Sequence, residues 1–403
     1  MKHLNYLTTL VLLLFSGISL QAQTQDPLQK ILKDELNYQF AEMKKQPNNA
    51  YFMDFRVIDR TSHTIQTDFG AVSGEYKSHV RNFVPSIRVG NSALDNQFEP
   101  HQTSLTQGGV MSISLPLKDD ANAIKQVIWE ECFNKYKRAV SDYERIVANQ
   151  KLRVENEDQT PSLNKPAVET FYEAPLTAEQ TAFDTKLWSE RMKKVSAEFQ
   201  KNPDLMSGSA TIAFEYQRRY YISTEGTDVV QNSTYVRISI NAMLKADDGM
   251  DLPLYQSYFA FSPDGLPTEE QMLADVKILM DKLVLLKNAP LAGPYTGPAL
   301  LSGEASGVFF HEIFGHRIEA QRMKSDADGQ TFKKLVGQNV LPSGLNVYSD
   351  PTLKTYIGED LNGYYKFDDQ GVKAQRVEVV KDGKLYNFLM TRTPIDGFEK
   401  SNG

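Results

Sequence analysis

The order of the predicted elements repeats along this chain, and that order constrains the fold more than any other feature of the sequence. Over residues 26–46, apolar side chains recur with the spacing of one helix face, and Pro47 ends the pattern. Residues 51–57 alternate between apolar and polar, which is typical of a strand with one buried face. Further strands are predicted at 64–68 and 82–89, and a long helix at about 119–147.

A second stretch has the same order of elements. It begins with a helical pattern over 177–200 and ends with a helix that opens at Thr268, where Gln271 three residues later completes a capping-box pattern. Strands are predicted between these helices at 210–216, 220–224 and 235–244. The chain therefore contains two helix–antiparallel sheet–helix units, residues 23–150 and 177–292, joined by a proline-containing linker over 151–176. We interpret the repetition as a weak internal duplication.

The remaining residues, 293–403, form a third and different region. A short strand is expected at 296–301, followed by a helix from about Gly303 to Met323. Beyond it the chain is rich in glycine and β-forming residues, and Lys381-Asp382-Gly383 predicts a hairpin between strands at 374–380 and 384–390. The fold class is thus α+β, with a β-rich C-terminal domain. Because the chain stops shortly after a strand, we expect this domain to be incomplete.

Composition limits the classes of protein to which the chain can belong. Of its 403 residues, 41% are hydrophobic, which is enough to fill a core and excludes a disordered or collagen-like chain. Lys and Arg total 44 against 51 Asp and Glu, a net charge of −7, so we expect no nucleic-acid partner. The single cysteine, Cys132, excludes an intrachain disulfide and fits the apolar stripe of its helix as a core residue.

Residues 1–22 have the pattern of a secretory signal peptide. Lys2 and His3 give a basic start, residues 7–20 are apolar, and Ala22 closes a plausible cleavage site. The apolar run is too short to span a bilayer comfortably, and no later segment is long and apolar enough. We therefore expect an exported protein, periplasmic or secreted, that is not inserted in a membrane after the signal is removed.

The segment His311-Glu312-Ile313-Phe314-Gly315-His316 is the strongest candidate for chemistry. In the helical zinc motif the two histidines lie four residues apart and share a face, with a glutamate between them as general base. Here they lie five residues apart, so a regular helix separates the two rings by about 140°. Zinc binding by His311 and His316 therefore predicts a deformed helix. A π-bulge would bring the rings together, and Gly315 is the position where backbone distortion costs least.

Glu319 belongs to a second pattern on the same helix. Glu312, His316 and Glu319 have i, i+4, i+7 spacing and share a face without distortion. Glu319 is then either a third metal ligand or a carboxylate that steers His316 through a hydrogen bond. The alternative is an amphipathic helix whose histidines are ordinary surface or core groups. Because apolar residues flank the polar set on almost every side, we expect the helix to be largely buried, which favours paired or metal-bound side chains.

Three segments of the C-terminal region resemble the TldD/PmbA family, the so-called modulators of DNA gyrase. The stretch 307–319, with its HExxxH motif and following glutamate, is similar to the signature helix of catalytic members. Asp368-Asp369-Gln370-Gly371 and the segment around Met390-Thr391-Arg392-Thr393-Pro394 also fit the family. The resemblance is strong over residues 297–403 and fair over residues 210–286.

The resemblance implies a zinc metallopeptidase that hydrolyses peptides or unfolded polypeptide segments. His311 and His316 would be Zn²⁺ ligands, and Glu312 would be the general base. The partner would be a homologous subunit in a hetero- or homodimer. In founding catalytic members a cysteine near the C-terminus completes the zinc site. No residue of this chain matches it, so we expect the third ligand to lie beyond Gly403 or to be of another type.

Two other functions stay open at this point. The chain could be a non-catalytic binding subunit that pairs with an active homologue, or a metal-stabilised structural subunit. The glutamate between two histidines favours the enzyme, because a scaffold gains nothing from that carboxylate.

Overall fold

The structure is a computed structural model that describes residues 26–97, 112–152, 160–324 and 330–403. The first unit contains α1 (Pro27–Met43), β1 (Ala50–Asp68), β2 (Ala71–Val89), β3 (Ile113–Ser114) and α2 (Ala121–Leu152). The linker contains β4 (Thr170–Tyr172), and the second unit contains α3 (Thr185–Ala197), β5 (Ser207–Ser223), β6 (Asp228–Lys245), β7 (Asp251–Ala260) and α4 (Glu269–Lys287). The C-terminal region contains α5 (Gly303–Ile313), β8 (Val347–Ser349), β9 (Thr355–Tyr356), β10 (Glu359–Asp360), β11 (Val377–Lys381) and β12 (Lys384–Leu385).

The strands of both units belong to one sheet. Its order is β3-β2-β1-β5-β6, and β4 and β7 both pair with β6. The units are joined by β1 and β5, which pair antiparallel from Asp54 opposite Ser223 to Asp68 opposite Ser209. The β4–β6 pair is parallel, and the other pairs of this sheet are antiparallel. The predicted class, helices with antiparallel sheet, is confirmed, and the predicted strands at 51–57 and 64–68 are parts of one long strand.

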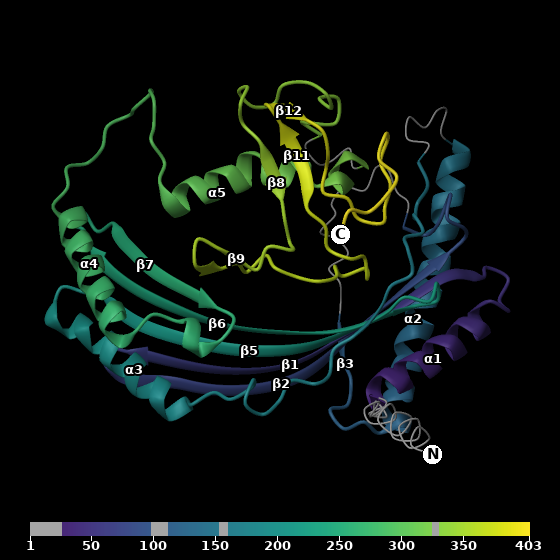
Figure 1. Ribbon diagram of the computed structural model, residues 1–403, viewed down its shortest axis with the longest axis horizontal. Helices are drawn as coiled ribbons and strands as arrows, with labels where there is room; N and C mark the ends of the chain where they lie inside the picture. The colour runs from purple at the N-terminus through teal and green to yellow at the C-terminus, as the bar shows by residue number, and fades with distance from the viewer. Residues whose placement is uncertain (1–25, 98–111, 153–159, 325–329) are drawn as a thin grey trace, which may run out of the picture.

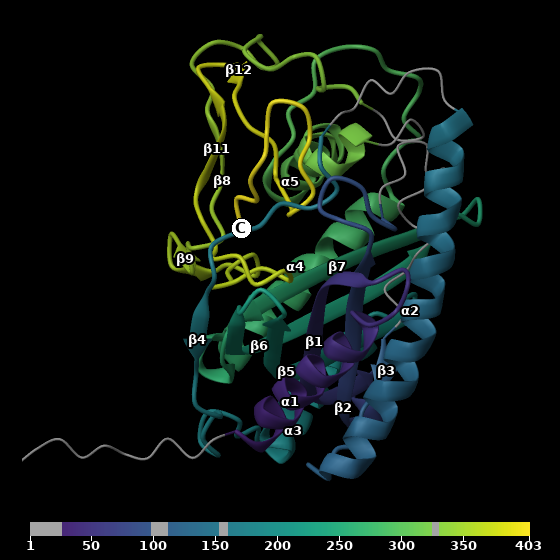
Figure 2. The same ribbon diagram turned by 90° about the vertical axis from the view of Figure 1, so that its right-hand side faces the viewer.

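Helices α1–α4 cover one face of the sheet, and the C-terminal region covers the other (Figures 1 and 2). Met53 and Phe55, near the start of β1, pack with α1 and α2, whereas Ile65, near its end, packs with α3 and α4. Successive side chains of a strand point to opposite faces, so these odd-numbered residues lie on the same face. Two helix pairs therefore bury the two ends of one sheet face in separate cores.

One helix cap and one turn have the structures that the sequence predicts. The Thr268 hydroxyl accepts a hydrogen bond from the backbone N–H of Gln271 at 3.3 Å, and α4 begins at the next residue, as predicted. The predicted hairpin is confirmed between β11 and β12, where Asp382 and Gly383 have φ of 47° and 78°. Both values lie in the left-handed region that a two-residue hairpin of this kind requires.

Two predictions for the start of the C-terminal region are wrong. Residues 296–301 form no strand, and Leu300 is 98% exposed. An apolar run shows that a segment can pair, but it carries no information on whether a neighbouring strand is available. The helix predicted over 303–323 ends at Ile313 and continues as two short 3₁₀ turns, Gly315–Ile318 and Ala320–Lys324.

Buried polar contacts fix the C-terminal region on the sheet. The guanidinium of Arg392, which is 1% exposed, donates to Glu225 and to the backbone carbonyl of Asn164 at 2.7 Å each. Gln231 of β6 exchanges two hydrogen bonds with the backbone of Phe367. The region also has a core of its own, formed around Phe314, Ile318, Val379, Leu385 and Phe388.

Some expectations concern residues that the structure does not describe. The predicted signal peptide, residues 1–22, lies outside the described residues, as does part of the predicted linker. In the described part of that linker, residues 170–172 form β4. Among the described helices, none has the length and apolar character needed to cross a membrane.

Candidate metal centre

Helix α5 ends between the two histidines. The backbone N–H of Phe314 still bonds the carbonyl of Phe310 at 3.0 Å, but Phe314 itself has φ −124° and ψ −53° and leaves the helical conformation. The chain then tightens into the 3₁₀ turn that carries His316. As a result, the ring centroids of His311 and His316 are 4.4 Å apart. The predicted deformation is present, but it is a helix end followed by a 3₁₀ turn rather than a π-bulge.

Three side chains converge at this break. One carboxylate oxygen of Glu312 lies 3.9 Å from Nε2 of His311, and the other lies 3.9 Å from Nε2 of His316. The possible ligand atoms of the three residues all lie within 4.8 Å of one another. Two ligands at about 2 Å from one tetrahedral zinc ion are separated by roughly 3.3 Å, so this donor set fits zinc after small side-chain rotations.

Glu319 contacts the histidine that follows the break. Its Oε1 lies 2.7 Å from Nδ1 of His316, and its Oε2 accepts a hydrogen bond from Nε of Arg322 at 2.6 Å. Partial burial raises the pKa of Glu319, but the hydrogen bonds from Arg322 and His316 outweigh that effect and lower its pKa overall. Of the two roles considered for Glu319, this contact has the geometry of the one that orients His316.

The expectation that this helix is largely buried is wrong. The side chains of His311 and Glu312 are 61% and 62% exposed, and α5 contains no buried residue. Val308 and Phe309 are more than half exposed as well. Burial begins only where the helix has ended, at Phe314, because the C-terminal core lies beside the 3₁₀ turns.

One cavity adjoins the candidate site. It has a volume of about 550 Å³ and is lined by Glu319 and Gln321, by Arg219 of β5 and by Asp369. Glu319 is thus shared by the histidine cluster and the cavity.

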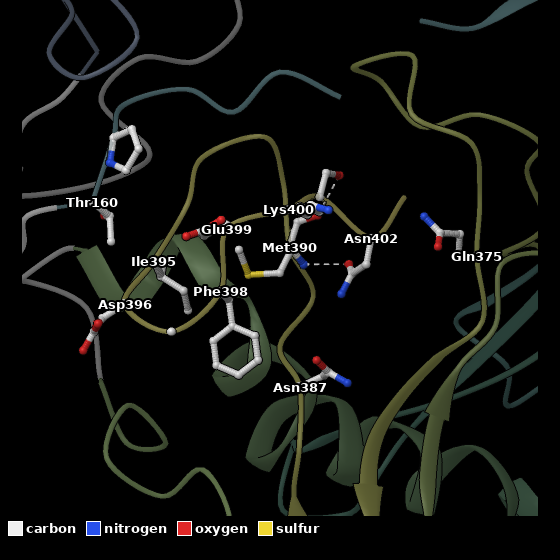
Figure 3. Close-up of a pocket in the computed structure, with 13 residues that line it drawn as sticks. Thr160, Gln375, Asn387, Met390, Ile395, Asp396, Phe398, Glu399, Lys400 and Asn402 are labelled. Carbon is white, nitrogen blue, oxygen red and sulfur yellow. Dashed lines mark hydrogen bonds between the residues drawn. The ribbon is translucent and has the colours of Figure 1, made fainter. Parts of the chain in front are cut away.

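A second cavity, of about 990 Å³, lies between Thr160 and the last residues of the chain (Figure 3). Its wall includes Met390 and Asn402, which also line the first cavity. Figure 3 shows the hydrogen bond from the backbone N–H of Met390 to the Asn402 side chain, 2.8 Å long. This contact belongs to the wall that the two cavities share.

Cys132 and two further histidines lie away from this site. Cys132 is fully buried in α2 among apolar side chains, which confirms its interpretation as a core residue, and burial raises its pKa well above the usual value. His63 and His79 lie on β1 and β2, in the sheet. Sequence reasoning missed Arg322, although its i+3 spacing from Glu319 is typical of an ion pair on one helical face.

Comparisons with known proteins place the chain among metallopeptidase-like sequences. The sequence matches the PmbA/TldA metallopeptidase central domain over residues 178–270 and the C-terminal domain of the same family over residues 294–401. A metalloprotease of Archaeoglobus fulgidus is 33% identical over 104 residues, which are 26% of this chain and 22% of that protein. A zinc metalloprotease TldD homolog of Saccharolobus solfataricus is 24% identical over 194 residues, 47% of this chain and 41% of that protein.

Solved structures show the same fold. TldE from Thermococcus kodakarensis superposes with a TM-score of 0.54 over 90% of this chain and 70% of that chain, at 12% identity. The matched segments span less than half of either curated relative named above. The two domain matches, the HExxxH segment at the end of α5 and the shared fold together show that the chain belongs to the TldD/PmbA family.

Proposed function

We propose that this chain is a zinc-dependent peptidase that hydrolyses peptides or unfolded polypeptide segments, with His311 and His316 as zinc ligands and Glu312 as general base. The observation that carries the proposal is the helix break, which brings both imidazoles and the carboxylate within 4.8 Å. The names of the relatives support a metallopeptidase, and one of them is named a zinc enzyme.

Each residue of the site has a separate role in hydrolysis. Zinc, when bound, acts as a Lewis acid that polarises a water molecule and the peptide carbonyl. Glu312, 3.9 Å from both Nε2 atoms, can take a proton from water at this position and pass it to the leaving amine. Glu319 accepts a hydrogen bond from Nδ1–H of His316, and this tautomer leaves the lone pair of Nε2 free to bind the metal.

A Glu312→Gln variant tests the base assignment. The amide keeps the shape of the side chain but accepts no proton, so hydrolysis of an unfolded polypeptide should fall by about 10² or more. Zinc content and the melting temperature should stay at the wild-type values. Glu304→Gln, in the exposed first turn of the same helix, is the matched control and should retain full activity. A variant that hydrolyses as fast as the wild type contradicts Glu312 as base.

The zinc content and the activity of the wild-type protein in the same experiment distinguish an enzyme from a non-catalytic subunit. A wild-type protein that binds one zinc ion per chain yet hydrolyses no peptide is a binding or structural subunit. If the protein binds no zinc after reconstitution, His311 and His316 do not form a zinc site, and the proposal is wrong.

The proposal also includes a homologous subunit as partner and an exported location. The first is supported by the fold shared with TldE, and the second by the signal-peptide pattern of residues 1–22. N-terminal sequencing of the mature protein from a periplasmic or secreted fraction tests the second, because cleavage after Ala22 leaves Gln23 as the first residue.

A further inference from the structure

A third cavity lies beside the start of α3, the helix that covers this end of the sheet (Figure 1). It has a volume of about 460 Å³, which is in the range of pockets that hold small molecules. Its wall is formed by residues of β1, of β2 and of the segment that leads into α3, among them His63, Ile65, Glu75, Lys77, Phe183 and Thr185. None of these residues belongs to the candidate metal centre or to the two cavities described above.

The inner part of the cavity is aromatic and apolar. Ile65 is fully buried in the core beneath α3 and α4. The ring centroid of Phe183 lies 5.7 Å from that of His63 and 5.3 Å from that of Phe214 on β5, and the rings of Phe183 and Phe214 are within 13° of parallel. Aromatic rings attract one another at these separations, so Phe214 holds Phe183 in place. An aromatic ring is therefore the ligand group that this wall fits best.

His63 adds an uncharged ring to this wall. Burial lowers the pKa of His63, and the charge of Lys77 lowers it further, whereas Glu75 raises it and only partly offsets the two. Because an ordinary histidine has a pKa of about 6.5, this ring is neutral at pH 7. Among the described residues, no hydrogen bond occupies its nitrogens. The ring face is thus available for contact with an apolar or aromatic group.

Two opposite charges stand at the outer side of the cavity. Glu75 and Lys77 lie two residues apart on β2, so their side chains leave the same face of the strand about 7 Å apart. Both charges act on the pKa of His63, so both charged groups lie near its ring. Within the described part of the chain, neither side chain forms an ion pair. The cavity therefore offers one carboxylate and one ammonium group beside an aromatic wall.

We propose that this cavity binds a free aromatic amino acid. The ring of the ligand lies against Phe183 and His63, its α-ammonium group pairs with Glu75, and its α-carboxylate pairs with Lys77. A ligand with a single charge would leave one of the two protein charges without a partner. A residue inside a peptide carries neither α-charge, and a terminal residue carries only one. A free amino acid is the form in which both charges and the ring occur together.

A ligand series tests this assignment by isothermal titration calorimetry of the full chain. L-Phenylalanine should bind with a dissociation constant of about 1 mM, because both ion pairs are exposed to water and contribute little each. 3-Phenylpropionate lacks the ammonium group and 2-phenylethylamine lacks the carboxylate, and each should bind about threefold more weakly or worse. L-Alanine lacks the ring and should bind about tenfold more weakly or worse.

N-Acetyl-L-phenylalaninamide represents the same residue inside a peptide. It keeps the ring but carries neither charge, so it should bind more weakly than L-phenylalanine. Equal affinity for the two would mean that the ring alone is recognised and would overturn the inference. So would the absence of L-phenylalanine binding at about 10 mM.

Variants at the two charges show which group of the ligand each one holds. Lys77→Met should weaken L-phenylalanine and 3-phenylpropionate, but it should not weaken 2-phenylethylamine, which has no carboxylate. Glu75→Gln should weaken L-phenylalanine and 2-phenylethylamine, but not 3-phenylpropionate. Both residues are exposed, so neither change should affect folding. Variants that weaken no ligand, or all ligands equally, contradict the assigned pairs.

Three controls accompany the variants. Lys30→Met and Asp34→Asn remove the charges of an exposed ion pair of 2.6 Å on α1 and should leave the affinity unchanged. Circular dichroism melting of each variant confirms that a loss of binding is not a loss of the fold. Protein treated with a zinc chelator should bind L-phenylalanine as the untreated protein does. Binding that is lost with the metal would place the ligand at the His311–Glu312–His316 cluster and overturn the inference, whereas absence of peptidase activity would leave it intact.

Discussion

Oε1 of Glu319 lies 2.7 Å from Nδ1 of His316, and the same carboxylate accepts a hydrogen bond from Arg322 through its other oxygen. The ring is thus held from its Nδ1 side, while Nε2 lies toward Glu312 at 3.9 Å. Such a contact fixes both the tautomer and the direction of a histidine before any metal binds.

Glu319→Gln should therefore weaken zinc binding by about 10–100-fold without unfolding the protein. The amide carries no negative charge, so its hydrogen bond with Nδ1–H of His316 is weaker. The ring of His316 then becomes less basic and is held less firmly in its direction. Competition with a chelator of known zinc affinity measures the change, and Glu304→Gln in the same helix is the control. Unchanged affinity would show that Glu319 does not act through His316.

Gly371 allows the C-terminal region to approach β5. Its φ is +72°, and a Cβ there would lie 2.4 Å from a ring carbon of Tyr221, which is 6% exposed. Gly371→Ala should lower the free energy of unfolding by more than about 2 kcal/mol, through backbone strain and displacement of the ring together. Gly397→Ala has a similar φ of +78° with no atom within 4 Å, so it should show the backbone cost alone, about 1 kcal/mol. Urea unfolding measures the loss of unfolding free energy in both variants. Equal losses would contradict a close approach of Gly371 to Tyr221.

Much of the fold follows from local pattern. Helices α1–α4, the cap at Thr268 and the turn at Asp382 depend on neighbours in sequence, and each was predicted from sequence. The union of two units through β1 and β5 depends on pairing between residues more than 140 positions apart. Alternation along β1 shows which residues are buried but cannot name the strand beside it.

The sequence predicted that the side chains of His311, Glu312 and His316 come together, but not their surroundings. Binding of one metal ion by both histidines requires a break in the helix, because a regular helix places residues five apart on different faces, and the break is present. The burial of α5 was inferred from composition, and this inference failed since apolar residues such as Val308 and Phe309 need a neighbour to cover them. In the described part of the chain, no element covers them.

Arg392 is a buried charged residue that attaches the C-terminal region to the rest of the protein. Its side chain is 2% exposed, forms an ion pair of 2.7 Å with Glu225, and lies 4.7 Å from the ring centre of Phe52. Arg392→Met leaves the Glu225 carboxylate and the Asn164 carbonyl without this donor, at a cost of about 3–5 kcal/mol. Arg376→Met, which removes an exposed guanidinium, should cost less than about 1 kcal/mol. Similar melting temperatures for the two variants would contradict this role.

Asp54 makes stability depend on pH near neutrality. Burial raises its pKa to about 7, despite the opposing charges of Arg88, Arg392 and Arg56. In the unfolded chain an aspartate has a pKa of about 3.9. Between these values the folded protein keeps a proton that the unfolded chain releases, so the free energy of unfolding falls as pH rises, by up to about 1.4 kcal/mol per pH unit.

Asp54→Asn should remove this dependence, because the amide mimics the protonated carboxyl at every pH. Urea unfolding of both proteins at about pH 5 and about pH 7 isolates the contribution, since the other titrating groups cancel in the difference. Relative to the variant, the wild type should lose about 2–3 kcal/mol between these two pH values. A constant difference would mean that Asp54 titrates at its ordinary pKa. If the free energy of unfolding of the wild type instead rises relative to that of the variant as pH rises, the three arginines outweigh burial and hold the carboxylate ionised.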